Sequence, residues 1–293
     1  MNKIKLSIFI TSGIITFFSC KLNYSDDQKK IASFTETNFT ETKFTETKDN
    51  ELNLQKDTKK QVDQRSTKDL KIPIKDKTDL IDKLSEILTR EMPIIKRDRL
   101  QTEIPSQFGL KNSMFELINV YKINSKNGEK LREKMNSSLT ESQKMRRQFY
   151  SSLSYNTTDI FNLAEIVNKL YKNPKAHDTI KKISRGIQIQ QRFEVALEDL
   201  SININTLKEN TFNKNTLEEI YAVIVDLVEI KKEWLNTIET LIKSSNATLE
   251  LQYNTEKLKD HIQELYKDKI ISICSRSEQA LIHLDTLFKC NKI

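Results

Sequence analysis

Residues 217–241, LEEIYAVIVDLVEIKKEWLNTIETL, decide the fold class of this chain. Apolar residues that recur every three or four positions lie on one face of an α-helix. The positions that carry the pattern here are Leu217, Ile220, Ile224, Leu227, Val228, Leu235, Ile238 and Leu241. The stretch therefore predicts one long helix with a continuous apolar face.

Trp234, the only tryptophan, lies within this pattern. Tryptophan often anchors protein interfaces, so a binding role is one interpretation. However, Trp234 lies next to Leu235 on the apolar side of the predicted helix, where burial in the core is the commoner outcome. We expect Trp234 to be a core residue.

Helical patterns extend on both sides of this stretch. Between Pro73 and Ile293 there are only three glycines and four prolines, too few for the turns of a β-rich domain. The other predicted helices cover about 80–92, 114–121, 140–153, 160–171, 178–200 and 251–288. Residues 73–293 are therefore expected to form a single all-α domain, an elongated multi-helix bundle of about six to seven helices.

Several residues predict where helices start, stop or break. The first helix should end before Pro93, because a proline ring clashes with the preceding turn. Thr140 and Gln143 have the spacing of a capping box. Gly186 should cost the helix over 178–200 about 1 kcal/mol relative to alanine. Asn173-Pro174 should end the helix before it, and Ser275–Glu278 resembles a capping box that could interrupt the last helical stretch.

The amino terminus has the order of an export signal. Lys3 and Lys5 precede an apolar run that ends in TFFSCKLN, residues 16–23, and the run is too short to span a bilayer comfortably. The Ser-Cys pair resembles the lipobox of bacterial lipoproteins, which predicts a signal peptide over residues 1–19 and lipid attachment at Cys20. The alternative is an ordinary secretory signal with an incidental cysteine.

Residues 20–72 differ in composition from the rest of the chain. The segment FTETNFTETKFTETK repeats with a period of five, which fits neither a helix nor a strand, so Phe34, Phe39 and Phe44 cannot share a face. The remainder is rich in Lys, Asp, Gln and Thr and cannot bury enough apolar surface to fold. We expect a disordered tether between the lipidated cysteine and the helical domain.

The charge pattern argues against nucleic-acid binding. The net charge of +7 is spread along the chain, whereas nucleic-acid binders concentrate Lys and Arg on one face. The nearest run, Lys144, Arg146 and Arg147, is interpreted as a solvated helix face. The acidic pairs Glu198-Asp199 and Glu218-Glu219 are interpreted as residues that keep helices soluble.

Two cysteines remain besides Cys20. Cys274 and Cys290 would lie about 24 Å apart on a continuous helix, and a disulfide requires about 6 Å between Cα atoms. An intrachain bond is therefore disfavoured unless the carboxy terminus folds back. Free thiols or an interchain bond remain open.

No pattern indicates a catalytic or cofactor site. His177, His261 and His283 have no metal-ligand spacing, and no two glycines lie close enough to cradle a phosphate. We expect no enzyme activity, no cofactor and no bound metal. No ligand-binding residues are assigned.

The layout resembles a known family. The cysteine in FFSC, the Lys/Thr/Glu-rich tether, and the stretches LIDKLSEILTREMP, TDIFNLAEIVNKLYKNP and YAVIVDLVEIKKEWLNTIETLI are similar to outer-surface lipoproteins of Lyme disease spirochaetes (Borrelia) related to complement regulator-acquiring surface protein 1. The resemblance implies an all-α lipoprotein on the outer membrane, exposed at the surface. Within the family, one member binds complement factor H and is a homodimer, others bind plasminogen or terminal complement components, and several have no established ligand. The resemblance therefore implies host proteins as partners and leaves open whether this chain forms a homodimer.

The leading functional hypothesis is a surface lipoprotein that binds host or tick proteins in immune evasion or transmission. The alternative is a structural or antigenic coat lipoprotein with no specific ligand. An enzyme would need clustered carboxylates or a Ser-His pair in a cleft.

Overall fold

The computed structural model describes residues 76–123, 130–209 and 212–290. All of them belong to the second of the two units into which the chain divides, residues 57–293. They form nine α-helices, so the predicted all-α class is confirmed and the predicted number of helices is too low. The predicted signal peptide, Cys20, the tether and the domain start at residue 73 lie outside the described residues and stay predictions.

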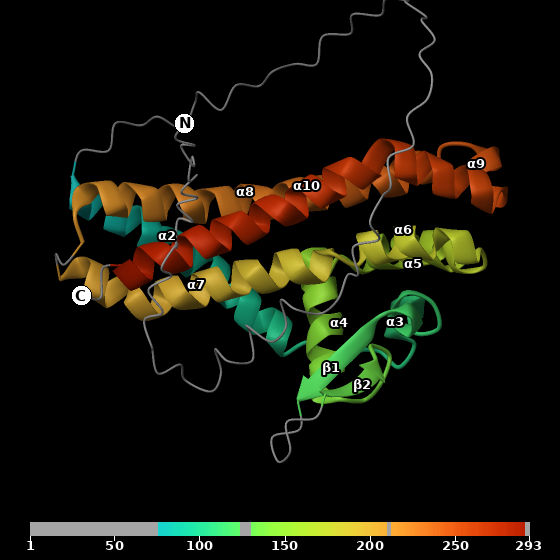
Figure 1. The fold of residues 1–293 in the computed structure, drawn as a ribbon, viewed down its shortest axis with the longest axis horizontal. Helices are drawn as coiled ribbons and strands as arrows, with labels where there is room; N and C mark the ends of the chain where they lie inside the picture. The colour runs from blue at the N-terminus through green and yellow to red at the C-terminus, as the bar shows by residue number, and fades with distance from the viewer. Residues whose placement is uncertain (1–75, 124–129, 210–211, 291–293) are drawn as a thin grey trace, which may run out of the picture. The chain divides into compact units, whose positions relative to one another are not determined.

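The two longest helices pack side by side. Helix α8 (Lys214–Ser245) contains the stretch that predicted it, and a short helix α9 (Leu249–Tyr253) connects it to α10 (Thr255–Cys290). The Ser244 Oγ lies 2.7 Å from the Tyr266 hydroxyl, and Arg276 donates to Glu233 over 2.7 Å, so the two helices are antiparallel (Figure 1). Helix α10 passes through Ser275–Glu278 without a break, so the predicted interruption there is wrong.

Helices α2 (Lys77–Arg99) and α7 (Gly186–Lys208) complete a four-helix bundle with α8 and α10. The Arg192 side chain of α7 donates to the carbonyl of Cys274 over 2.8 Å, which places α7 against the middle of α10. The bundle core is a single apolar cluster, and its fully or almost fully buried members include Leu80, Leu84, Ile95, Phe193, Leu200, Ile220, Ile224 and Leu284.

Helix α2 does not stop before Pro93, so that prediction is wrong. Pro93 lies inside the helix on its exposed side, where water can solvate the carbonyl that loses its donor. The helix continues because Ile95 and Asp98 beyond the proline are both buried.

The helix predicted over 178–200 is two helices. Helix α5 (Thr157–Tyr171) ends before Asn173-Pro174 as predicted, a 3-10 turn η3 (Pro174–Ala176) follows, and α6 (His177–Ile183) is separate from α7. Gly186 is the first residue of α7. A Cβ on Gly186 would lie 2.6 Å from both Cζ2 of Trp234 and Oγ of Ser152, so glycine is required there by close packing.

The helix predicted over 114–121 is present only in its first half, and the prediction is wrong from Ile118 onward, where the chain is extended. After a 3-10 turn η2 (Gln107–Gly109), α3 (Met114–Leu117) is a single turn and leads into a hairpin of β1 (Asn119–Ile123) and β2 (Lys130–Lys134). The strands are antiparallel, with Val120 opposite Glu133 and Tyr121 opposite Arg132. Val120 and Tyr121 favour a strand, and the apolar spacing over so few residues does not separate the two conformations.

Helix α4 (Thr140–Ser152) follows the hairpin. It starts where predicted, but without the predicted capping box, since Leu139 is the N-cap and no side chain caps the helix. The Gln143 amide donates instead to the carbonyl of Ser138 over 3.2 Å.

Candidate interaction surface

A second group of buried side chains lies outside the bundle core, where the segment between α2 and α4 packs on α4 and α5. The ring of Phe108 lies 4.8 Å from that of Tyr150 and 5.5 Å from that of Phe161, measured between centroids. Phe115 contacts Phe149 and Tyr150, each at 6.0 Å. Edge-to-face aromatic pairs at these distances are favourable, so the segment is fixed to both helices.

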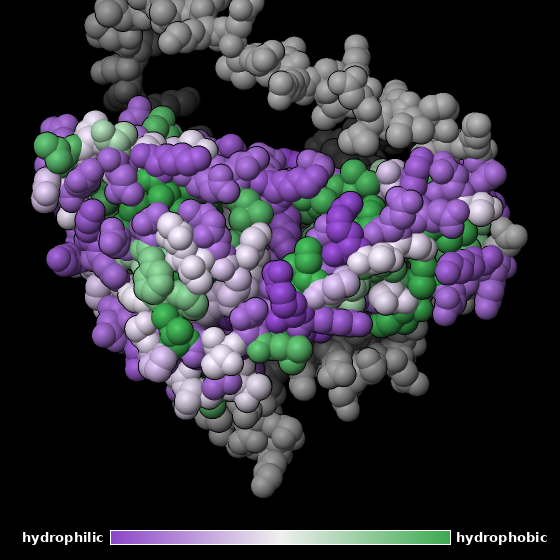
Figure 2. All heavy atoms as spheres, turned by 180° about the vertical axis from the view of Figure 1, so that it is seen from behind, coloured by the Kyte–Doolittle hydropathy of each residue, from purple (hydrophilic) through white to green (hydrophobic). Residues whose placement is uncertain are grey.

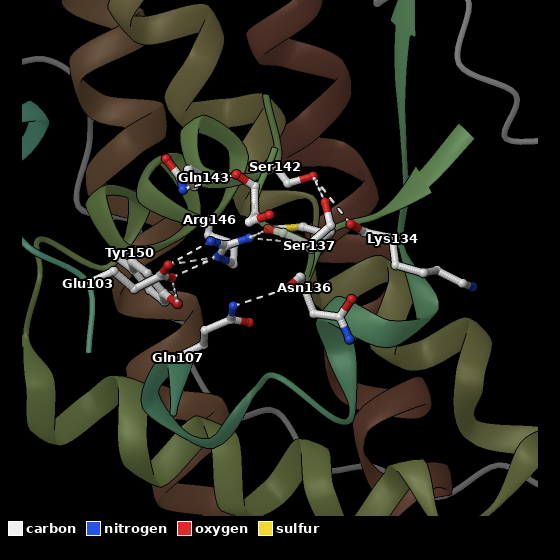
Figure 3. A network of polar contacts seen from close by, with 11 residues as sticks. Glu103, Gln107, Lys134, Asn136, Ser137, Ser142, Gln143, Arg146 and Tyr150 are labelled. Carbon is white, nitrogen blue, oxygen red and sulfur yellow. Dashed lines mark hydrogen bonds and ion pairs between the residues drawn. The ribbon is translucent and has the colours of Figure 1, made fainter. Parts of the chain in front are cut away.

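Arg146 of α4 is the centre of a polar network beneath this segment (Figure 3). Its guanidinium donates to both carboxylate oxygens of Glu103, with distances of 2.7 to 3.0 Å, and to the carbonyls of Met135 and Ser137. Its side chain is only 3% exposed. One arginine therefore connects α4 both to the loop after α2 and to the turn after β2.

Tyr150 completes the network by donating its hydroxyl proton to Glu103 over 2.7 Å. Burial raises the pKa of this phenol well above its ordinary range, and the hydrogen bond to the Glu103 carboxylate raises it further. The hydroxyl thus stays protonated at any physiological pH and acts as a permanent donor.

The backbone of the loop that carries Phe108 is strained. Gln107 and Phe108 have φ of 50° and 55°, in the left-handed region that side chains disfavour, and Gly109 follows at 85°. Each such residue costs of the order of 1–3 kcal/mol and persists only where the surroundings enforce it. Here Phe108 is held between Tyr150 and Phe161.

This region also presents apolar side chains to solvent. Leu100 is 84% exposed, Ile104 is 37% exposed and Phe161 is 46% exposed. Ile104 is in the strained loop, since its carbonyl accepts from the backbone N–H of Gln107 over 2.9 Å. We call these three side chains the loop surface. On the face seen in Figure 2, hydrophobic residues form small islands between hydrophilic ones.

A second polar cluster joins α2, α4 and α7. Glu194, with a side chain 3% exposed, accepts two hydrogen bonds of 2.9 Å from Arg147 and one of 3.3 Å from Arg99. Burial alone would raise the pKa of this carboxyl, but the bonds and charge of Arg147, with Gln190 and Arg99, lower it below its usual value. Glu194 is therefore ionised and held by two arginines.

The interpretation of Lys144, Arg146 and Arg147 as a solvated face is wrong for both arginines. Arg146 and Arg147 have side chains 3% and 13% exposed, because the partly buried Glu103 pairs with Arg146 and the buried Glu194 pairs with Arg147. The sequence holds a signal for this: Arg146 lies within the apolar positions Met145, Phe149 and Tyr150 of the same helix. Glu103 and Phe108 belong to a loop without periodicity, and no comparable signal marks them.

The other residues singled out from the sequence lie in packing contacts or, for His283, at the surface. Trp234 is fully buried, as predicted, and its indole N–H donates to Ser152 Oγ over 3.2 Å. His177 stacks on Tyr171, and His283 lies 3.6 Å from Glu219.

Within the described residues no group of His, Cys, Asp and Glu side chains could hold a metal ion. Cys274 is a buried free thiol that donates to Gln188 over 3.2 Å.

His261 and Ser244 are within hydrogen-bond distance of each other, as the serine and histidine of a hydrolase active site are. The His261 Nε2 lies 3.0 Å from the Ser244 Oγ, between α8 and α10. However, Ser244 also contacts the Tyr266 hydroxyl and donates to the carbonyl of Leu241 in its own helix, and no described carboxylate orients the histidine. The arrangement lacks the third group of a catalytic triad and is that of an interhelix contact.

No described helix combines the length and the apolar composition needed to cross a bilayer. A search of curated protein sequences gives no match. The family described as "Borrelia Bbcrasp-1 domain containing protein" matches residues 97–287.

Solved structures agree with the family match. The Lyme disease associated outer surface protein BBA65 from Borrelia burgdorferi is 79% identical, with a TM-score of 0.67, over 71% of this chain and 99% of that one. The Borrelia burgdorferi outer surface lipoprotein BBA64 is 24% identical, with a TM-score of 0.63, over 73% of this chain and 98% of that one. The second likeness concerns the fold alone.

The resemblance inferred from the sequence is thus confirmed, and so is the surface-exposed location at the outer membrane. This chain belongs to the Borrelia family of outer surface proteins that contain the Bbcrasp-1 domain.

Proposed function

We propose that this protein is a lipid-anchored surface protein that binds host or tick proteins and serves immune evasion or transmission, and that it is not an enzyme. The observation that carries the proposal is the loop surface. It offers exposed apolar side chains on a protein that faces the outside of the cell.

The loop surface has two properties that favour binding. Leucine, isoleucine and phenylalanine side chains supply apolar area that a partner can bury. The loop beneath them is fixed by Arg146 and by the ring of Phe108, so ordering costs on binding are small. The lipid on Cys20 and the tether over residues 20–72, both predicted from the sequence, would hold this surface away from the membrane.

The partners to examine first are those that the family suggests: complement regulators, terminal complement components and plasminogen. The chain from Lys21 onward, without the lipid, is tested against an immobilised panel of these proteins and of tick salivary proteins. Saturable binding to at least one of them is the expected result. No saturable binding to any protein on the panel would refute the proposal for those hosts and vectors.

Two variants locate the contact. Ile104→Ser and Phe161→Ser should each weaken binding several-fold, while Ile202→Ser, at a residue 74% exposed on α7, should not. Thermal unfolding of all three variants shows whether the fold is retained. If Ile202→Ser weakens binding and the other two do not, the contact lies on α7 and not on the loop surface.

A coat protein without a specific ligand is the second candidate. On the face seen in Figure 2 the apolar islands are small, which favours it for that face, because large exposed apolar patches mark interaction sites. Deletion of the gene separates the two candidates. If the protein binds host factors in immune evasion, the deletion strain should survive less well in serum. If it is a coat protein, the deletion should cause no loss of survival in serum.

A further inference from the structure

The segment between α2 and α4 is separate from the bundle core. The apolar cluster of the bundle is built from α2, α7, α8, α10 and the loop before α8. It contains no side chain from residues 96–192. We call the described residues 103–123 and 130–138 the strap. Removing the strap from its place would leave the bundle core intact.

Hydrogen bonds within the strap join its first part, before β1, to its last part, after β2. Gln107 donates to the carbonyl of Asn136 over 3.2 Å, and Asn136 donates to the carbonyl of Lys111 over 3.0 Å and to Glu116 over 2.6 Å. The backbone N–H of Met135 donates to the carbonyl of Ile118 over 2.9 Å. The loop before β1 and the turn after β2 are therefore tied together.

The connections of the strap to α4 converge on one side chain. Arg146 bonds Glu103 at one end of the strap and the carbonyls of Met135 and Ser137 at the other. The remaining polar contacts come from smaller groups: Tyr150 to Glu103, Ser142 to Lys134 and Ser137, and Gln143 to Ser138. Loss of the guanidinium would weaken the attachment of both ends of the strap at once.

The closed position of the strap also holds strain. Gln107 and Phe108 keep positive φ because the Phe108 ring lies between Tyr150 of α4 and Phe161 of α5. Once the ring leaves these partners, both residues can return to ordinary backbone conformations. The strain therefore favours opening, whereas buried strap side chains such as Leu110, Met114 and Phe115 favour closure.

We propose that the strap opens from the helical body as one unit, that Arg146 is the latch that holds it closed, and that opening uncovers Phe149 and Tyr150 of α4. The open state is rare, because several apolar side chains must leave their partners. It belongs to the sub-global openings that hydrogen exchange detects. This inference does not depend on the proposed ligand binding.

Hydrogen exchange followed by mass spectrometry tests the proposal on the chain from Lys21 onward. In wild type at low urea, amides of the strap should share one opening reaction that precedes global unfolding. In Arg146→Met, exchange in the strap should accelerate at least tenfold and keep the weak urea dependence of a partial opening, while exchange in α8 and α10 keeps the steep urea dependence of global unfolding.

Lys144→Met, at an exposed position of the same helix, is the matched control and should change neither region. An equally steep urea dependence of exchange in the strap and in α8 would show one cooperative unit and overturn the proposal, as would an unchanged exchange rate in the strap of Arg146→Met. If Arg146→Met does not fold, the wild-type measurement is sufficient to test the opening of the strap. Strap amides that exchange only through global unfolding would then refute the inference.

Discussion

Gly186 and Trp234 are in direct contact across α7 and α8: a Cβ added to the glycine would lie 2.6 Å from Cζ2 of the indole. The indole is fully buried, and its N–H is bonded to Ser152, the same side chain that would meet the added Cβ. Neither neighbour can move without breaking this bond. The start of α7 is thereby placed against α4 and α8.

Gly186→Ala should destabilise the protein, although alanine is the better helix former by about 1 kcal/mol. The steric clash prevails because overpacking of a filled core typically costs about 1–3 kcal/mol. Urea unfolding followed by circular dichroism measures the change. Ser201→Ala, at an exposed position of the same helix, should lie within about 0.5 kcal/mol of wild type. An equally stable Gly186→Ala would mean that the indole has room to move.

Lys231→Met should stabilise the protein by about 1 kcal/mol. Lys231 is 9% exposed, and its ammonium lies 4.5 Å from the centre of the Phe193 ring. Burial lowers the pKa of this lysine, and the attraction of Glu91, Asp98 and Glu194 only partly offsets the effect, so folding disfavours the charged form. Methionine keeps the volume and removes the charge.

The stability of the protein should also depend on pH through Lys231, in a direction that follows from its lowered pKa. Because the pKa of Lys231 is lower in the folded than in the unfolded chain, wild type should gain stability as pH rises through the folded pKa toward about 10.4. Lys231→Met should lack this gain. Lys232→Met, at a side chain 61% exposed, is the control and should resemble wild type. A less stable Lys231→Met would show that its attraction to the three carboxylates outweighs burial.

Glu194 predicts a loss of stability in acid. Its pKa is lower in the folded chain than in the unfolded one, so its contribution is complete above the ordinary carboxyl pKa of about 4.3 and is lost as pH falls through the folded value. Glu194→Gln should therefore be less stable than wild type at neutral pH and approach it below pH about 4. Glu218→Gln, at a side chain 44% exposed, should show almost no difference at either pH. A gap between Glu194→Gln and wild type that stays constant down to pH about 2 would contradict the assignment.

Cys20→Ala should abolish lipid attachment. Metabolic labelling with palmitate should mark the wild-type protein and not the variant, and external protease should remove the wild-type body from intact cells. Palmitate label on the variant would place the lipid elsewhere. Protection of the wild-type body from protease would contradict a position outside the cell.

The long helices could be predicted from the sequence, because a face repeated over many turns has one structural solution. Helix α8 starts three residues before Leu217 and ends four residues after Leu241, the limits of its pattern. Pro93 was misleading because the cost of a proline depends on whether the freed carbonyl meets water, which the sequence does not state. Residues 114–121 were misleading because three apolar positions fit a helical turn and a strand equally well.

The candidate surface was predictable only in part. Burial of Trp234 follows from its neighbours in one helix, whereas burial of Arg146 depends on Glu103, which lies 43 positions away in the sequence. An ion pair between residues far apart in the chain produces no periodic pattern in the sequence. The same holds for Phe108, whose strained backbone is set by rings in α4 and α5.

The bundle core has a consequence for how the protein is made and exported. Its members in α2, such as Leu80 and Leu84, pack in one cluster with Ala280, Leu284 and Phe288 near the carboxy end of α10. These contacts join parts of the chain that leave the ribosome at opposite ends of synthesis, and such long-range contacts slow folding. The cluster cannot close until the last helix has been translated. Until then the nascent chain lacks its complete core, a state compatible with the export that the signal peptide predicted over residues 1–19 implies.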